Sequence, residues 1–279
     1  MRVLVTGRGT GGSWTIRGQQ LGEALGATID PNANSVKGFD LAIVVKRPRA
    51  DLLERLRHRG TPIVWDMVDF WPQPEGNNWE RDVLMGWLRD EVNRVQPAAL
   101  VAATKAMAKD CVEFNVPVLY LPHHARPDQL RNPIRKLVQA VGYEGGPQYV
   151  AKWGPVLEEQ CRRRGWRFVI NPSSLDTLDI VVAVRDQKGY APRNWKSNVK
   201  LANAQSTGTP CVLAREQGYL EAACGAEEWA DTVEELNDAF DKLLEQNTRQ
   251  IVQRHLISAA PTIEGMATRY QAWLRQLSF

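Results

Sequence analysis

Short runs of β-branched and other apolar residues alternate with amphipathic segments along this 279-residue chain, and that alternation limits the fold more than any other feature. Such a pattern is typical of β-α-β units, in which helices cover a parallel sheet. In the first half it predicts strands at 2–6, 39–45, 62–66, 99–103 and 116–121, and helices at 16–26, 51–59, 79–94 and 104–114.

Residues 122–133 interrupt the alternation with three prolines in twelve positions. Proline removes backbone donors and restricts the residue before it, so this segment indicates a linker. The alternation then restarts, with strands expected at 138–143, 166–170, 178–184 and 210–213 and helices at 148–163 and 196–207. The chain is therefore expected to be an α/β protein with a first domain over 1–124, a linker over 125–135 and a second domain over 136–261.

Composition excludes several classes of protein. The chain is 43% hydrophobic and 24% charged, as expected of a globular protein with a real core. Its four cysteines are far apart and form no CxxC pair, so neither a disulfide framework nor a metal site is indicated. No apolar stretch approaches the length of a membrane span, and no signal-peptide pattern follows Met1. A reduced, cytoplasmic enzyme is the expectation.

Charge is distributed unevenly along the chain. Residues 216–246 carry ten acidic side chains and one lysine, a net charge of −9, so the remainder carries +3 + 9 = +12. Basic residues cluster at 46–49, 55–59, 131–136 and 162–164. Each cluster alone is typical of a solvated helix face, but together they permit a polyanionic partner such as DNA.

A glycine-rich loop follows the first expected strand. Gly7, Gly9 and Gly12 satisfy the spacing GxGxxG, and Asp30 lies 18 residues beyond Gly12, as in a dinucleotide-binding fingerprint. A nicotinamide-dependent oxidoreductase is therefore one interpretation. The bulky Trp14 stands where the helix of a fingerprint packs closely on the strand, and no Tyr-x-x-x-Lys pair follows. No Walker A motif is present.

Two other segments hold candidate acid–base groups. Asp66 and Asp69 lie at the C-terminal end of the expected strand 62–66, at the edge where parallel sheets place ligand sites. Asp69 precedes Phe70 and Trp71, and an apolar setting would raise its pKa and suit it to act as a base; a loop-capping role is the alternative. His123 and His124 lie in the proline-rich segment, where one of them could serve as a base or as a donor to substrate, or both could be structural.

The most informative segment is 179–210. A strand ends at Arg185, and a helix is expected to begin near Lys196, with Lys196 and Lys200 on one face beside its first backbone amides. Amide donors, a positive helix end and two ammonium groups together predict a diphosphate site, with a solvated basic helix as the alternative.

This segment carries a family resemblance. The run Asp179–Val184, the sequence Lys200-Leu-Ala-Asn-Ala-Gln-Ser-Thr-Gly-Thr-Pro210 and the turn Gly218-Tyr-Leu-Glu221 resemble the second domain of GT-B glycosyltransferases, whose helix reads K-x-x-E-A-M-A-x-G-x-P. Val141–Gly146 resembles the opening strand of that domain, and Leu119–Pro122 the strand before its linker. The resemblance covers 139–221 closely and 1–121 in architecture only. Asn203 replaces the family's Glu.

The resemblance implies two Rossmann-like domains facing across a cleft, with the last helix, 262–279, returning to the first domain. It also implies metal-independent transfer of a sugar from a nucleotide-diphosphate sugar, a UDP-sugar being the expected donor, with no cofactor. The expected donor-binding residues are Gly145, Gly146, Arg185, Lys196, Ser197, Lys200, Asn203 and Glu221. Gly11, Gly12, Ser13 and Arg17 would close over the leaving phosphates or the acceptor. If the reaction inverts the anomeric centre, the base would be Asp69, or else His123 or His124.

The acceptor stays open at this point. Small GT-B enzymes include phage glycosyltransferases that modify hydroxymethylated DNA bases, and the +12 balance outside 216–246 would suit such an acceptor. A non-catalytic module that binds a sugar nucleotide or nucleic acid is a further alternative, because Asn203 removes a charge that the family usually carries.

Overall fold

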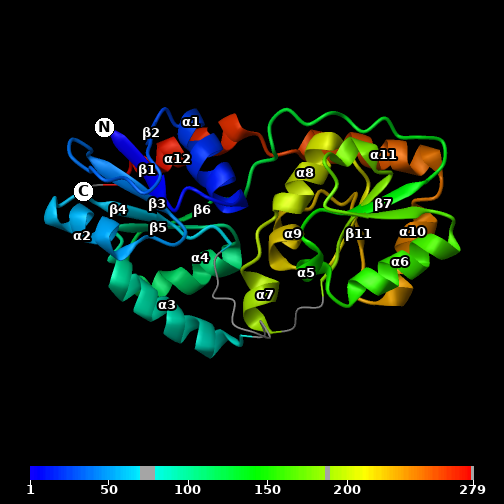
Figure 1. Ribbon diagram of the computed structural model, residues 1–279, viewed down its shortest axis with the longest axis horizontal. Helices are drawn as coiled ribbons and strands as arrows, with labels where there is room; N and C mark the ends of the chain where they lie inside the picture. The colour runs from blue at the N-terminus through cyan, green and yellow to red at the C-terminus, as the bar shows by residue number, and fades with distance from the viewer. Residues whose placement is uncertain (70–78, 186–188, 278–279) are drawn as a thin grey trace. The chain divides into compact units, whose positions relative to one another are not determined.

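The computed structural model describes residues 1–69, 79–185 and 189–277 (Figure 1). Among these residues the chain forms two compact units. Unit 1 contains residues 1–123, 189–197 and 262–277, and unit 2 contains residues 124–185 and 198–261. Within the described ranges, no helix is both long and apolar enough to cross a membrane.

Unit 1 is built on a six-stranded sheet in which all neighbouring strands are parallel. The strand order is β2 (Thr28–Ile29), β1 (Val3–Gly7), β3 (Leu41–Val45), β4 (Ile63–Asp66), β5 (Ala99–Ala102) and β6 (Val118–Tyr120). The connecting elements are η1 (Trp14–Gln20), a π-helical stretch, α1 (Leu21–Ala24), α2 (Ala50–His58), α3 (Arg81–Val95), α4 (Lys105–Cys111) and η2 (Val112–Phe114).

Helices cover both faces of this sheet (Figure 1). Successive residues of a strand point to opposite faces, so both faces of a parallel sheet with apolar strands must be covered. Along β3, Leu41, Ile43 and Val45 pack with α1 and with α12 (Ile263–Leu274), which lie side by side. Ala42 and Val44 point the other way, into a core shared with α2, α3 and α4. Because β3 is buried along its whole length, its sequence is apolar throughout.

Unit 2 is built on a five-stranded parallel sheet. The strand order is β11 (Glu228–Trp229), β10 (Cys211–Leu213), β9 (Ile180–Ala183), β7 (Ala140–Tyr143) and β8 (Arg167–Ile170). Its helices are α5 (Pro147–Val150), α6 (Trp153–Arg163), η3 (Leu175–Thr177), α8 (Val199–Thr207), α9 (Gln217–Ala222), α10 (Val233–Lys242) and α11 (Gln246–Ala259). The acidic segment thus contains α10, whose Thr232 and Glu235 form a capping box.

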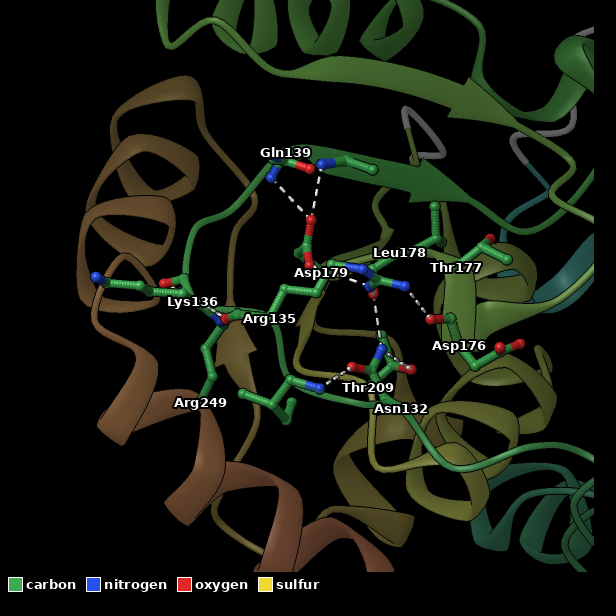
Figure 2. A network of polar contacts seen from close by, with 12 residues as sticks. Asn132, Arg135, Lys136, Gln139, Asp176, Thr177, Leu178, Asp179, Thr209 and Arg249 are labelled. Carbon is green, nitrogen blue, oxygen red and sulfur yellow. Dashed lines mark hydrogen bonds and ion pairs between the residues drawn. The ribbon is translucent and has the colours of Figure 1, made fainter.

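The proline-rich segment differs from the expected linker over 125–135, because much of it is fastened to unit 2 (Figure 2). Asn132 is buried and donates from Nδ2 to the carbonyl of Leu178 at 2.7 Å. The buried Asp179 accepts from the backbone N–H groups of Gln139 and Ala140 at 2.8 and 2.9 Å and pairs with Arg135 at 3.3 Å. These polar contacts therefore fasten the segment to residues 178–179, although it is neither a helix nor a strand.

Residues 189–197 also differ from expectation, because they lie in unit 1 and not in the domain expected over 136–261. Their helix is α7 (Tyr190–Asn194). Tyr190 Oη and Trp195 Nε1 each donate to Asp110 Oδ2 at 2.9 Å, and Thr104 Oγ1 donates to the carbonyl of Asn194 at 2.7 Å. Two donors that meet the buried Asp110 carboxylate, one of them the buried Trp195 indole, thus fix this segment to unit 1.

Candidate functional site

In unit 2, a lysine and a glycine lie together at the carboxyl end of the sheet. Gly145 lies two residues beyond the end of β7, and Lys200 is in the first turn of α8. Lys200 Nζ lies 3.9 Å from the centroid of the Tyr143 ring. Gly145 has φ +145°, and a Cβ there would lie 3.1 Å from Tyr143 Cε1 and 3.4 Å from Lys200 Nζ. The absence of a side chain at 145 therefore leaves room beside the ammonium group for a ligand.

Glu144 lies next to these residues and is almost fully buried. Asn203 Nδ2 donates to its Oε1 at 2.8 Å, and Arg126 Nη2 pairs with the same oxygen at 2.9 Å. The backbone N–H of Arg126 in turn donates to Asn203 Oδ1 at 2.9 Å. Burial raises the pKa of Glu144, while Arg126 and Lys200 act in the opposite direction. Sequence reasoning did not single out Glu144, whose only signal was its place beside Gly145.

Arg185 occupies a buried pair near the same edge of the sheet. Its Nη1 lies 3.2 Å from Glu216 Oε2, and its Nη2 donates to Tyr219 Oη at 3.2 Å. Burial raises the pKa of Tyr219, against the influence of the Arg185 guanidinium. The Arg185 guanidinium group, which was expected to bind the donor diphosphate, is thus already balanced by the carboxylate of Glu216. Gly146, just before α5, and Glu221, on α9, are both half-buried in unit 2.

In unit 1, side chains from different loops meet at the carboxyl ends of the strands. Lys46 follows β3, and its Nζ donates to Ser13 Oγ at 2.8 Å and to Asp69 Oδ1 at 3.2 Å. Its backbone is fixed as well: the N–H donates to the carbonyl of Asp66 at 2.8 Å, and the carbonyl accepts from Trp65 Nε1 at 2.7 Å. The sequence showed Lys46 only as a member of a basic cluster and gave no sign of this role.

Asp69 differs from the expectation of a raised pKa. Burial acts to raise the pKa of this carboxyl, but Lys46, Lys196 and His123 outweigh it and hold the pKa well below its usual range. The expectation rested on Phe70 and Trp71, which lie outside the described residues. Because Asp69 remains ionised at neutral pH and binds a proton weakly, it suits hydrogen bonding to a hydroxyl better than general-base catalysis.

Arg17 was expected to close over phosphate, and the structure places it in the core of unit 1. Its side chain is fully buried, with Nε 3.9 Å from Asp66 Oδ2, and its Nη2 donates to the carbonyl of Leu121. Burial raises the pKa of Asp66, and the Arg17 guanidinium opposes that effect. The fully buried Tyr270 of α12 lies near enough for both charges to act on its hydroxyl. Arg17 is thus paired within the core of unit 1 and is not exposed at the glycine-rich loop.

The other predicted residues fall in both units. Lys196 and Ser197 are buried in unit 1, ahead of α8, so Lys196 is not at the beginning of that helix as expected. His123 is buried in unit 1 and His124 in unit 2. Gly11 and Gly12 are exposed. In the described ranges, no group of three or more His, Cys, Asp or Glu side chains is placed to hold a metal ion.

The glycine-rich loop packs around an indole. A Cβ at Gly7 would lie 2.9 Å from the carbonyl oxygen of Val45 and 3.2 Å from Trp14 Cε3, and a Cβ at Gly18 would lie 2.3 Å from Trp14 Cε3. Trp14 is buried against both positions. Gly7 is therefore explained by the close approach of the Val45 carbonyl and the Trp14 ring, without reference to a dinucleotide.

No family model matches the chain, and no curated protein matches its sequence significantly. Solved structures do match. Anabaena HepE, in complex with UDP and glucose, has a TM-score of 0.67 at 11% identity, covering 99% of this chain and 100% of that one. Sucrose-phosphate synthase from Thermosynechococcus elongatus has a TM-score of 0.64 at 10% identity, covering 99% of each chain. WaaG, a glycosyltransferase involved in lipopolysaccharide biosynthesis, has a TM-score of 0.59 at 12% identity, covering 97% and 98%.

The fold is therefore that of the GT-B glycosyltransferases, with two parallel sheets and their covering helices. This confirms the fold class that the sequence predicted. The match extends over residues 1–121, where the sequence resembled the family in architecture only.

Proposed function

We propose that this protein is a metal-independent glycosyltransferase that transfers a sugar from a nucleotide-diphosphate sugar and needs no cofactor. The observation that carries the proposal is Lys200, which lies beside Gly145 in the first turn of α8, at the carboxyl end of the unit 2 sheet. Ligands of open α/β sheets bind at this edge. The GT-B fold supports the proposal, and the UDP bound to HepE suggests UDP as the nucleotide.

Transfer of the sugar leaves negative charge on the departing diphosphate. In this proposal the Lys200 ammonium group and the first amides of α8 stabilise that charge, with no metal needed. Gly145 and Gly146 allow the backbone to approach the phosphates, and Asn203 and Glu221 contact the ribose or the sugar. Arg185 does not bind the phosphates directly in this proposal, because its guanidinium group already contacts Glu216 and Tyr219.

Unit 1 holds the acceptor in this proposal. The ionised Asp69 accepts a hydrogen bond from the acceptor hydroxyl and orients it for attack. His123 lies close enough to Asp69 to interact with it electrostatically, and in its neutral form it is the first choice for the group that takes the proton if the reaction inverts the anomeric centre. This order reverses the expectation from the sequence, because the cations around Asp69 make it a weak base.

The version with a DNA acceptor loses part of its electrostatic basis. Six arginines of the basic clusters share four neighbouring carboxylates: Arg49 and Arg55 pair with Asp51, Arg162 and Arg163 with Glu159, Arg164 with Asp241 and Arg135 with Asp179. Such pairs reduce the field that would attract a polyanion. A small-molecule acceptor fits this surface better.

Calorimetric titration with UDP tests the donor site, using Lys200→Ala and Lys136→Ala. Lys136 is an exposed lysine before β7, at the opposite edge of the same sheet, so both variants remove one positive charge from unit 2. We expect Lys200→Ala to weaken UDP binding at least about tenfold, equivalent to about 1.4 kcal/mol. Lys136→Ala should bind as the wild type does.

Equal affinity in the two variants would contradict the phosphate role of Lys200, and a wild-type protein that does not bind UDP would contradict the UDP assignment. Release of UDP from UDP-glucose, followed over time, separates an enzyme from a binding module, since a module binds the sugar nucleotide without consuming it. Titration with NAD and NADP tests the oxidoreductase alternative, which predicts that either of these binds and UDP does not.

A further inference from the structure

Unit 2 contains a buried carboxylate that is held through only one of its two oxygens. Glu144, the residue between β7 and Gly145, is 6% exposed. Its Oε1 accepts from Asn203 Nδ2 at 2.8 Å and pairs with Arg126 Nη2 at 2.9 Å. Its Oε2 is buried as well, and among the described residues this oxygen has no hydrogen-bond partner. Both neighbouring donors therefore serve the same oxygen, and the other oxygen is left without one.

The contacts around Glu144 fix this asymmetry. Asn203 is fully buried, and its Oδ1 accepts from the backbone N–H of Arg126 at 2.9 Å. Because the oxygen of the Asn203 amide is used in this way, the amide presents its Nδ2 to Glu144. Asn203 lies on α8 and Glu144 directly follows β7, so the bond fixes the carboxylate between a helix and a strand. The side chain of Glu144 is therefore oriented before any ligand binds.

The arrangement at Glu144 is unusual for a buried carboxylate. Burial of a carboxylate oxygen without a donor is unfavourable, so an exception in a folded protein calls for an explanation. Two other buried carboxylates of unit 2, Asp179 and Glu227, have donors on both of their oxygens. The unpartnered Oε2 of Glu144 therefore indicates a place for a donor that does not belong to the described chain.

The surroundings of Glu144 are those of the proposed donor site. Gly145 and Gly146 follow it and are half-buried, and Lys200 Nζ lies 3.4 Å from the position of a Cβ at Gly145. Arg126 has half of its side chain exposed. A ligand bound beside Lys200 is therefore next to Glu144. It can reach Oε2 past a residue without a side chain, once the long and half-exposed Arg126 side chain moves aside.

We propose that Glu144 Oε2 accepts a hydrogen bond from a hydroxyl group of the nucleotide-sugar donor. The proposal rests on the proposed function and adds a residue that determines specificity at the same site. The hydroxyl group is carried by the ribose or by the transferred sugar, and in both cases a donor that lacks it leaves a buried oxygen without a partner. A site built to bond a hydroxyl group rejects an analogue without that group strongly.

Calorimetric titration of the full chain with UDP, 2′,3′-dideoxy-UDP and UDP-glucose tests the proposal. Glu144→Gln must turn its amide oxygen toward Asn203 and Arg126, because both are donors, and it therefore places an NH2 group where Oε2 was. This exchange removes the acceptor for the ligand and keeps the contacts within the protein.

The two sources of the hydroxyl group give different results. If the ribose carries it, the wild type should bind UDP at least about tenfold more tightly than the dideoxy analogue, and Glu144→Gln should lose most of that preference. If the sugar carries it, Glu144→Gln should bind UDP as the wild type does and bind UDP-glucose at least about tenfold more weakly.

The control is Glu158→Gln, which removes a negative charge from an exposed position of α6 in the same unit and should keep the preferences of the wild type. The preference between ligands is the informative quantity, because a purely structural role of Glu144 would weaken all three ligands alike. If Glu144→Gln does not fold, a crystal structure of the wild type with UDP-glucose decides instead. A ribose or sugar hydroxyl should then lie about 3 Å from Oε2.

The outcomes separate this proposal from the proposed function. Equal weakening of all three ligands, no weakening of any, or a water molecule at Oε2 in place of a hydroxyl group would overturn the proposal. The donor site would then still stand, because Lys200→Ala tests it independently. A wild-type protein that binds neither UDP nor UDP-glucose would overturn the proposed function and this proposal with it.

Discussion

Asn203 Nδ2 donates to Glu144 Oε1 across 2.8 Å, and this bond joins the α8 helix to the end of β7. The helix sequence of the family that this chain resembles has Glu at the position of Asn203. Here the carboxylate belongs to Glu144 instead, and the Asn203 amide binds it. One buried carboxylate is thus present between α8 and the end of β7, although it comes from the residue after β7 and not from α8.

Asn203→Glu should therefore destabilise the protein, because it would place a second carboxylate against the buried Glu144. Leaving a buried polar group without its partner costs about 1–3 kcal/mol, and repulsion between the two carboxylates adds to that cost. The free energy of unfolding, measured in urea at pH 7, gives the loss directly.

The control is the double variant Glu144→Gln/Asn203→Glu, which exchanges the amide and the carboxylate. It retains one negative charge beside Arg126, and we expect it to recover most of the lost stability. A double variant no more stable than Asn203→Glu would show that size, and not charge, limits this position.

The alternation of strand-like and helix-like segments predicted the α/β class from local patterns. The GT-B fold and the expectation that Gly145 and Lys200 serve one donor site came from the family resemblance, and the structure places these two residues next to each other. Lys196 was misplaced because helical spacing from Lys200 says nothing of Asp110, 86 positions earlier in the sequence, which holds the residue before Lys196 in unit 1.

Arg17 and Asp69 could not be predicted for the same kind of reason. An arginine near a glycine-rich loop is typical of a phosphate site. The orientation of Arg17, however, depends on Asp66, at the end of β4, and on Leu121, just after β6. The pKa of Asp69 depends on Lys46 and Lys196, which are remote in sequence. Local sequence shows the residue type, whereas tertiary contacts decide the charge environment.

The depressed pKa of Asp69 predicts a pH-dependent contribution to stability. A carboxyl whose pKa is lower in the folded than in the unfolded state stabilises the fold above its unfolded pKa. That stability is lost as the pH falls through the folded-state pKa. Asp69→Asn should therefore cost about 1.5–3 kcal/mol at pH 7, the range for hydrogen bonds to charged groups, and progressively less below pH about 4.

Urea unfolding of Asp69→Asn and of the wild type from pH 7 down to pH 3 measures this difference. Asp90→Asn is the control, since Asp90 is exposed on α3, and it should stay near the wild type at every pH. If the cost of Asp69→Asn were the same at pH 3 as at pH 7, charge pairing would not be its origin.

Asp110 predicts a local effect on residues 189–197. Asp110→Ala removes the acceptor of the half-buried Tyr190 Oη and of the fully buried Trp195 Nε1, and it breaks the pair with Arg81; the indole N–H left without a partner alone costs about 1–3 kcal/mol. Hydrogen exchange followed by mass spectrometry should show faster exchange in peptides that cover 190–195. The control is Glu113→Ala, which breaks an exposed pair with Arg89 and should change stability by less than about 1 kcal/mol. Unchanged exchange at 190–195 would mean that apolar packing alone holds α7.

Two glycines in unit 1 should respond in opposite directions to the same substitution. A Cβ at Gly18 would lie 2.3 Å from the Trp14 ring, so Gly18→Ala should cost about 1–3 kcal/mol by overpacking. Gly86 lies inside α3 with nothing within 4 Å of such a Cβ, so Gly86→Ala should stabilise by about 0.5–1 kcal/mol through helix propensity. Thermal unfolding of both variants measures the contrast. Adding Trp14→Leu should reduce the stability cost of Gly18→Ala. If the double variant instead loses as much stability as the two single variants together, the contact with Trp14 does not explain the glycine at position 18.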